Sequence, residues 1–163
     1  MKLVLSILLY KIHILNMADV HDKKTRSYNM SQIKCRDTKP EQIVRKFIFK
    51  NGFRYKKNVI NLPGKPDIVL PKYKTIIFVH GCFWHGHKNC QYASIPKTKT
   101  EWWLNKIGKN KLNDAKHFKA LKKLGWQVFI IWECNIKKNN QTYLLNLINN
   151  LTEIKINGTK KKT

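Results

Sequence analysis

The clearest helical pattern in the chain lies between Thr38 and Gly52. Apolar residues recur there every three to four positions, the spacing that gives a helix one core-facing side: Ile43, Val44, Phe47 and Ile48. Thr38 can cap this helix, and Glu41 completes a capping box three positions later. Pro40 suits the first turn, and Gly52 follows the last one. The pattern predicts a helix that begins after Thr38 and ends before Gly52.

Two apolar runs, 76–79 and 128–132, show no alternation of polar and apolar residues. Such runs are typical of central strands that are covered on both faces. Shorter elements complete the prediction: strands near 53–59 and at 67–70, turns at 62–66 and 71–74, and helices over 101–124 and 139–151. Gly108 is a point at which the longer helix could break, and Gly125 terminates it. Helices that flank strands in this way predict a layered α/β domain around a mixed sheet.

The N-terminal region contains an apolar run over residues 3–10. This run resembles a weak signal peptide, but Lys11 and His13 interrupt it and no small-residue cleavage site follows. Met17 then opens a polar segment that reads like a second N-terminus. We interpret residues 1–16 as an N-terminal extension or a misassigned start, and assign them no function. No run reaches the ~20 apolar residues that cross a bilayer.

The chain carries a large surplus of positive charge. Its 163 residues include 33 Lys and Arg against 9 Asp and Glu, a formal net charge of +24. This surplus indicates a polyanionic partner, of which nucleic acid is the commonest. An anionic membrane surface is the second candidate, and a coding bias toward Lys, Asn and Ile is the alternative without a binding role. Hydrophobic residues make up 42% of the chain, which excludes a disordered polybasic tail.

Three of the six histidines and two of the four cysteines lie within residues 80–90. Thiolate and imidazole are the ligands that tetrahedral zinc prefers, and a structural site uses four of them. Cys82, His87 and Cys90 offer three ligands, and Cys134, which follows the second apolar run, is the natural fourth. The zinc should be structural, because no ligand position stays open. The alternative is that the cysteines are buried small apolar residues and the histidines surface groups.

His80 and His85 remain outside this ligand set, and Asp67 is predicted to lie beside the first of them. A turn of about four residues pairs 67–70 with 75–79 in antiparallel fashion, which makes Asp67 and His80 neighbours. A carboxylate beside a main-chain carbonyl at a strand end is a hard oxygen site that suits Mg²⁺ with several waters. Next to a histidine, such an ion indicates phosphodiester hydrolysis with the imidazole as proton acceptor. The alternative is that Asp67 is only a turn residue.

Three large aromatic residues stand outside the periodic core: Phe83, Trp84 and Trp103. Ordinary packing is the default for a tryptophan. Apolar side chains that a rigid loop holds beside a basic surface can instead wedge between base steps, and unstacking costs least where a duplex is already flawed. This combination indicates a nuclease that senses helix defects.

Ordered strings of residues then carry a family resemblance: Leu62-Pro63-Gly64-Lys65-Pro66-Asp67, His80-Gly81-Cys82-Phe83-Trp84-His85, Lys106-Ile107-Gly108-Lys109-Asn110 and Trp132-Glu133-Cys134. From about residue 17 to 138 the chain resembles the very short patch repair (Vsr) DNA mismatch endonucleases. The resemblance implies a restriction-endonuclease-like three-layer fold. It also implies Mg²⁺-dependent nicking of one strand, 5′ to the thymine of a T:G mismatch left by deaminated 5-methylcytosine.

The resemblance further implies roles for single residues. Asp67 and the backbone carbonyl of Val79 would bind magnesium, His85 would be the general base, and His80 and Glu41 would support the scissile phosphate. Zinc would be held by Cys82, His87, Cys90 and Cys134. Phe83, Trp84 and Trp103 would intercalate beside the mismatch, with Met30 near the minor groove and Lys106 and Asn110 close to the mispaired bases. For Glu41 this role outweighs simple helix capping, although one residue can do both.

Two positions depart from the family pattern. Val79 stands where the family has Thr, which the use of a backbone carbonyl tolerates. The spacing from His87 to Cys90 is one residue longer than the family's, which leaves His85 as an alternative metal ligand. The Glu-x-Lys motif of many nucleases is also absent after Asp67. Its absence fits a nuclease that uses histidine in its place.

The resemblance leads to four expected segments: the extension 1–16, a DNA-contacting arm over 17–37, an endonuclease domain over 38–152 and a basic tail over 153–163. We expect a cytoplasmic, nucleoid-associated monomer that binds double-stranded DNA, with mismatch-repair proteins as further partners and no membrane association. Two alternatives remain at this stage. One is a non-catalytic, zinc-stabilised DNA-binding module, and the other is a nuclease in which the loop metal itself is catalytic.

Overall fold

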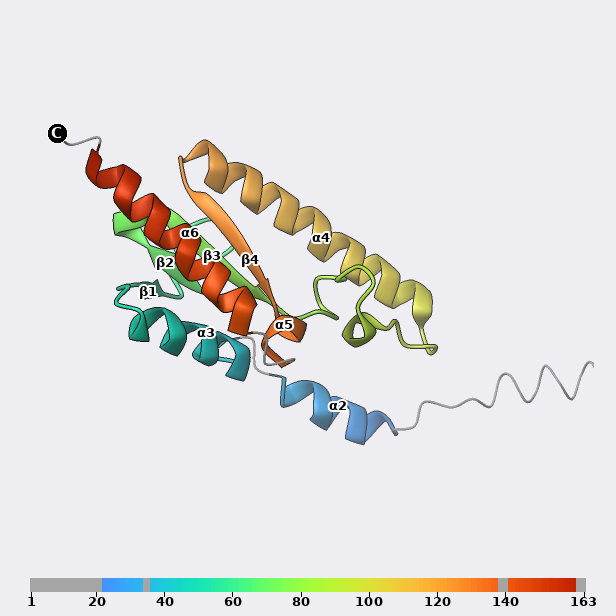
Figure 1. Cartoon of the computed structure of the whole chain (residues 1–163). Coiled ribbons are helices and arrows are strands. Elements are labelled where there is room, and N and C mark those ends of the chain that lie inside the picture. The colour runs from blue at the N-terminus through green and yellow to red at the C-terminus, as the bar shows by residue number, and fades with distance from the viewer. Residues whose placement is uncertain (1–21, 34–35, 138–140, 161–163) are drawn as a thin grey trace, which may run out of the picture.

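A computed structural model describes residues 22–33, 36–137 and 141–160 of the chain (Figure 1). The extension 1–16, the first residues of the expected arm, and Cys35 lie outside these ranges. The elements follow in the order α2 (Lys23–Ser31), α3 (Lys39–Lys50), β1 (Lys56–Lys57), β2 (Ile68–Leu70), η1 (Pro71–Tyr73), β3 (Thr75–His80), η2 (Gln91–Ala93), α4 (Thr100–Lys123), β4 (Gln127–Trp132), α5 (Glu133–Lys137) and α6 (Gln141–Lys160).

The strands form one mixed sheet in the order β1-β2-β3-β4. β2 pairs with β1 and β3 in antiparallel fashion, whereas β3 and β4 are parallel and are joined by α4. Leu70 lies opposite Thr75, as the predicted turn requires. The prediction that β4 is a central strand is wrong: β4 is an edge strand of this sheet, and most of its residues are only partly buried. Residues 128–132 of β4 are apolar because both faces of the strand pack against other elements, although only one of its edges pairs with another strand.

Alternate residues of the strands pack into two separate cores. One core joins Ile68, Leu70, Ile77 and Ile131 to buried residues of α3 and α6. The other joins Val69, Ile76 and Phe78 to Leu121 of α4. Figure 1 accordingly shows α3 and α6 on one side of the sheet and α4 on the other. The domain therefore has three layers, helix, sheet and helix, which confirms the predicted layered α/β domain around a mixed sheet.

The predicted helix starts and stops are largely confirmed. Thr38 caps α3 by accepting a hydrogen bond from the Glu41 backbone N–H, and Pro40 lies in the first turn. α4 passes through Gly108 without a break, and Ile107, the residue before it, is buried. Gly125 follows its end at φ +76, a backbone conformation that glycine adopts without strain. α6 continues to Lys160, well beyond the predicted end at 151, and the short helix α5 was not predicted.

The described part of the expected arm is the helix α2, which makes few contacts with the core. Asp22 caps it by accepting a hydrogen bond from the Thr25 backbone N–H at 2.6 Å. Met30 and Ile33 are 43% and 47% exposed, as isolated apolar residues of an arm should be. Within the ranges that the structure describes, no helix combines the length and apolar character needed to cross a membrane.

Candidate active site

A cleft of about 780 Å³ opens where β2 begins and β3 ends. Antiparallel pairing brings these two strand ends to the same edge of the sheet, and α3 and α4 contribute further walls. The chemically active residues that line it are Glu41, Asp67, His80, His85, Asp114, His117 and Glu133. The cleft also contains Trp84, Lys106 and Asn110, which were predicted to contact DNA. Met30, Phe83 and Trp103 are not part of its lining.

Asp67 directly precedes β2, and a hydrogen bond to β3 holds its side chain in place. Its Oδ2 atom accepts the backbone N–H of Val79 at 2.7 Å. Burial raises the pKa of Asp67 to about 6, while the Val79 N–H opposes this shift by stabilising the carboxylate. The structure thus places Asp67 beside Val79 and in one cleft with His80 and His85, as the strand register predicts. Because burial disfavours the ionised form of this carboxylate, a cation bound beside it would stabilise that form.

The rings of His80 and His85 stack face to face, with centroids 3.6 Å apart and planes 14° apart. His80 is only 4% exposed, and burial together with the neighbouring His85 lowers its pKa to about 4. His80 is therefore uncharged near neutral pH. One ring nitrogen of His80, one of His85 and one carboxylate oxygen of Asp114 all lie within 4.8 Å of one another. Two parallel rings cannot both aim their in-plane lone pairs at one ion, however, so we interpret this group as a proton-transfer site.

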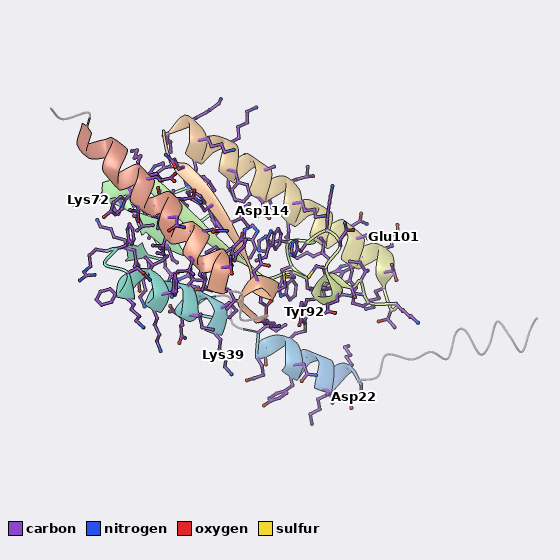
Figure 2. The ribbon with its side chains drawn as sticks, in the orientation of Figure 1. Asp22, Lys39, Lys72, Tyr92, Glu101 and Asp114 are labelled. Atoms are coloured by element: carbon purple, nitrogen blue, oxygen red, sulfur yellow. The ribbon has the colours of Figure 1, made fainter. Side chains whose placement is uncertain are left out.

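Asp114 is a functional candidate that the sequence analysis missed. Its Oδ2 atom lies 2.6 Å from Nδ1 of His85, 29 positions away in the chain. Figure 2 shows Asp114 on the side of α4 that faces the sheet. A carboxylate at Nδ1 fixes the proton on that nitrogen and leaves Nε2 free to accept another. The spacing of Lys106, Asn110 and Asp114 by four residues could have indicated a shared helix face.

The four predicted zinc ligands come together in the loop after β3 and at the start of α5. Their ligand atoms, from Cys82, His87, Cys90 and Cys134, all lie within 4.8 Å of one another. Nδ1 of His87 is 3.5 Å from the sulfur of Cys82 and 3.4 Å from that of Cys134. The structure therefore selects His87 over His85 as the histidine of this cluster. The set can hold one metal ion in tetrahedral coordination and would tie the loop to the sheet.

The aromatic residues of the same loop form a cluster with the start of α4. Phe83 packs edge-on against Trp84 and Trp103, with ring centroids 5.1 and 5.0 Å apart. Trp102, which adjoins Trp103, is 55% exposed. Asn110 donates a hydrogen bond to the carbonyl oxygen of Trp84 at 2.9 Å, which fixes the loop to α4. The cluster is thus a pinned and partly exposed apolar surface at one side of the cleft.

Glu41 lines the cleft, but both of its carboxylate oxygens are occupied. Thr38 donates its hydroxyl hydrogen to Oε1 at 2.8 Å, and the backbone N–H of Asp37 donates to Oε2 at 3.0 Å. Arg45, which the sequence analysis also missed, donates to Oε2 at 2.8 Å. Glu41 therefore stabilises the start of α3. A substrate that contacts Glu41 would have to bind oxygens that already accept these hydrogen bonds.

Comparisons with known proteins indicate the family of this chain. The family model described as DNA mismatch endonuclease Vsr matches residues 18–91. The type II nicking enzyme V.NmeAIP of Neisseria meningitidis is 50% identical over 121 residues, which cover 74% of this chain and 86% of that protein. The DNA mismatch endonuclease Vsr of Escherichia coli K12 is 46% identical over 121 residues, which cover 74% of this chain and 77% of that protein.

A mixed α/β domain with a carboxylate and histidine cleft, together with these relatives, defines the protein as a DNA endonuclease. More particularly, the chain belongs to the Vsr family, as the sequence motifs predicted.

Proposed function

We propose that the protein nicks one DNA strand 5′ to the thymine of a T:G mismatch, by Mg²⁺-dependent hydrolysis of the phosphodiester bond. The observation that supports this most strongly is the shared cleft of Asp67 and the His85–Asp114 pair. Two relatives are named a nicking enzyme and a mismatch endonuclease, which supports single-strand cleavage and a mismatched substrate. The three-layer architecture is compatible with a restriction-endonuclease-like fold.

The carboxylate of Asp67 and the backbone carbonyl of Val79 are the proposed ligands of Mg²⁺. Both offer the hard oxygen atoms that this ion prefers, and a valine serves as well as a threonine when only its carbonyl is used. When bound, Mg²⁺ would polarise the scissile phosphate and make a water molecule more acidic. The Val79 N–H holds Asp67 Oδ2, so the other oxygen of this carboxylate is the one that can face the cleft.

His85 is the proposed general base. Asp114 keeps the Nδ1 proton in place, so that Nε2 can accept a proton from the attacking water. His80 stacks on one face of the His85 ring and is uncharged, so it orients the base without repelling the protonated form that results. Glu41 is proposed as a support of this site through its ion pair with Arg45.

The cluster of Cys82, His87, Cys90 and Cys134 is proposed to hold structural zinc. For tetrahedral zinc, with Zn–S of about 2.3 Å and Zn–N of about 2.05 Å, the nitrogen-to-sulfur distance would be about 3.6 Å. The observed separations of 3.5 and 3.4 Å fit this value. Four protein ligands leave no open position, so a catalytic role for this metal is disfavoured.

DNA recognition is assigned to the aromatic cluster and the surfaces that flank the cleft. Phe83, Trp84 and Trp103 would enter the duplex beside the mismatch, where unstacking costs least. Lys106 and Asn110 line the cleft and would lie near the mispaired bases, and Met30 on α2 would approach the minor groove. The net charge of +24 favours binding along the phosphate backbone.

We further propose that this is a cytoplasmic, nucleoid-associated monomer, with residues 17–37 as a DNA-contacting arm. The endonuclease domain does not end at 152 as expected, because α6 continues to Lys160 and Ile154 packs against the core. Mismatch-repair proteins are proposed as further partners.

The direct test is incubation of the purified protein with end-labelled duplexes that carry one T:G pair in varied contexts. A nick 5′ to the thymine that requires Mg²⁺, with matched T:A duplexes left intact, would support the function. Wild-type protein that binds these duplexes and never cuts them would favour the non-catalytic DNA-binding module. Activity that is lost when the tightly bound metal is removed, and that does not depend on added Mg²⁺, would favour catalysis by the loop metal.

A further inference from the structure

Arg45 on α3 is a buried cation to which the proposed reaction gives no task of its own. Its side chain is 5% exposed, and it forms an ion pair with the 4% exposed side chain of Glu41 at 2.8 Å. The same guanidinium group binds the carboxylate of Asp37, the residue before the helix cap, which is held at φ +53. Burial of an arginine is costly unless its charge is paired, and here two carboxylates pair with it.

Arg45 also reaches the segment that carries the cleft carboxylate. Its Nη2 atom donates to the backbone carbonyl of Asp67 at 3.2 Å and lies 3.4 Å from the side-chain oxygen of Asn58. On the other side, the carboxylate of Asp67 accepts the Val79 N–H. One contact thus fixes the main chain of Asp67 and the other fixes its side chain, so both the place and the rotation of the carboxylate are determined.

We propose that Arg45 is a positioning residue that sets the geometry of the cation site at Asp67. This rests on the proposed function, in which Asp67 binds Mg²⁺. Glu41 and Asp67 both line the cleft, and Arg45 binds the carboxylate of the first and the backbone carbonyl of the second at the same time. Arg45 therefore fixes the segment of Asp67 relative to the start of α3, and so determines where the Asp67 carboxylate can meet a metal ion.

A lysine at this position separates charge from geometry. The planar guanidinium group carries five donors in fixed directions and can serve Asp37, Glu41 and the Asp67 carbonyl together. A lysine ammonium keeps the positive charge and can follow Glu41, but it is a single point and cannot hold all three acceptors. Arg45→Lys should therefore fold and bind DNA while the position of Asp67 relaxes.

The test compares Arg45→Lys with Arg54→Lys as a matched control. Arg54 is exposed, and its guanidinium group lies 4.2 Å from the centre of the Phe49 ring. We would measure the single-turnover nicking rate of a T:G duplex against Mg²⁺ concentration, DNA binding without Mg²⁺, and the melting temperature. Arg45→Lys should show a maximal rate, or an affinity for Mg²⁺, lower by roughly 10- to 100-fold, the usual effect of disturbing a group behind a metal ligand. DNA binding should stay within about threefold of wild type, and Arg54→Lys should match wild type throughout.

Wild-type Mg²⁺ dependence and rate in Arg45→Lys would overturn the inference. So would a loss of rate that is matched by weaker DNA binding or a lower melting temperature at an unchanged Mg²⁺ requirement, because that pattern describes an ordinary structural arginine. Should the wild-type protein itself show no Mg²⁺-dependent nicking, the proposed function fails, and the inference fails with it. The two failures are distinguished by the wild-type reaction alone.

Discussion

The hydrogen bond between His85 and Asp114 offers the sharpest test of the proposed chemistry, because Asp114→Asn changes it without changing shape. The carboxylate 2.6 Å from Nδ1 can only accept a hydrogen bond, so the ring must keep its proton there. An asparagine amide can instead donate to Nδ1. This moves the ring proton to Nε2, and a protonated Nε2 cannot act as a base.

The expected size of the effect follows from the role of the base and the exposure of the pair. General base catalysis contributes about 100- to 10,000-fold, which at ~1.36 kcal/mol per factor of ten is about 2.7–5.4 kcal/mol of barrier. The side chains of His85 and Asp114 are 27% and 21% exposed, so water screens them partly. Their contribution to the free energy of unfolding should therefore stay below about 1 kcal/mol. Nicking should fall steeply while stability hardly changes.

Single-turnover cleavage of an end-labelled T:G duplex, with urea unfolding in parallel, provides the assay. The double variant with His85→Ala is the control, because two residues that act through one proton transfer are not additive. The double variant should be no slower than His85→Ala alone. The reasoning is refuted if Asp114→Asn cleaves within about threefold of wild type, or if the two losses multiply.

Three further changes test other parts of the account. If the cysteine and histidine cluster holds structural zinc as proposed, Cys134→Ala should lower the zinc content and reduce the melting temperature by at least about 5 °C, because a structural metal contributes to folding; metal analysis and calorimetry check this, and an unchanged melting temperature would contradict it. Gly86→Ala should destabilise the protein to urea by about 1–3 kcal/mol, because Gly86 has φ +57 and a Cβ atom there would meet Lys111 and come within 2.7 Å of Ile107; wild-type unfolding would show that the loop can move away. Trp84→Ala should weaken binding to a T:G duplex by roughly 5- to 150-fold, the value of one stacked base, and equal losses on T:G and T:A duplexes in a binding assay would argue against a wedge at the mismatch.

Local sequence patterns were sufficient for the elements whose signals lie within the element. Thr38, Pro40 and the apolar residues between 43 and 48 predict α3, because capping and helical spacing are local properties. The turn between β2 and β3 sets the strand register, and the register in turn brings Asp67 to the same edge as His80. The cluster that could hold a metal was predictable because thiolate and imidazole groups are uncommon, and three of its four members lie within residues 82–90.

The rest depends on how elements pack, which no local pattern contains. Asp114 is one acidic residue on a long basic helix, and only the docking of α4 turns it toward His85. Arg45 looks like an exposed residue of α3 until the cleft side of that helix is known. The edge position of β4 could not be predicted either. A strand whose two faces are covered by helices has the same apolar sequence whether it has a neighbouring strand on one side or on both.

The most direct test of the central claim is a comparison of DNA binding and nicking in Asp67→Asn. The amide retains an oxygen that can accept the Val79 N–H but removes the charge that a divalent ion needs. We predict that this variant binds a T:G duplex as wild type does and shows no nick 5′ to the thymine at any Mg²⁺ concentration at which wild type cuts. Nicking at the wild-type rate would contradict the assignment of the metal site, and with it the proposed mechanism.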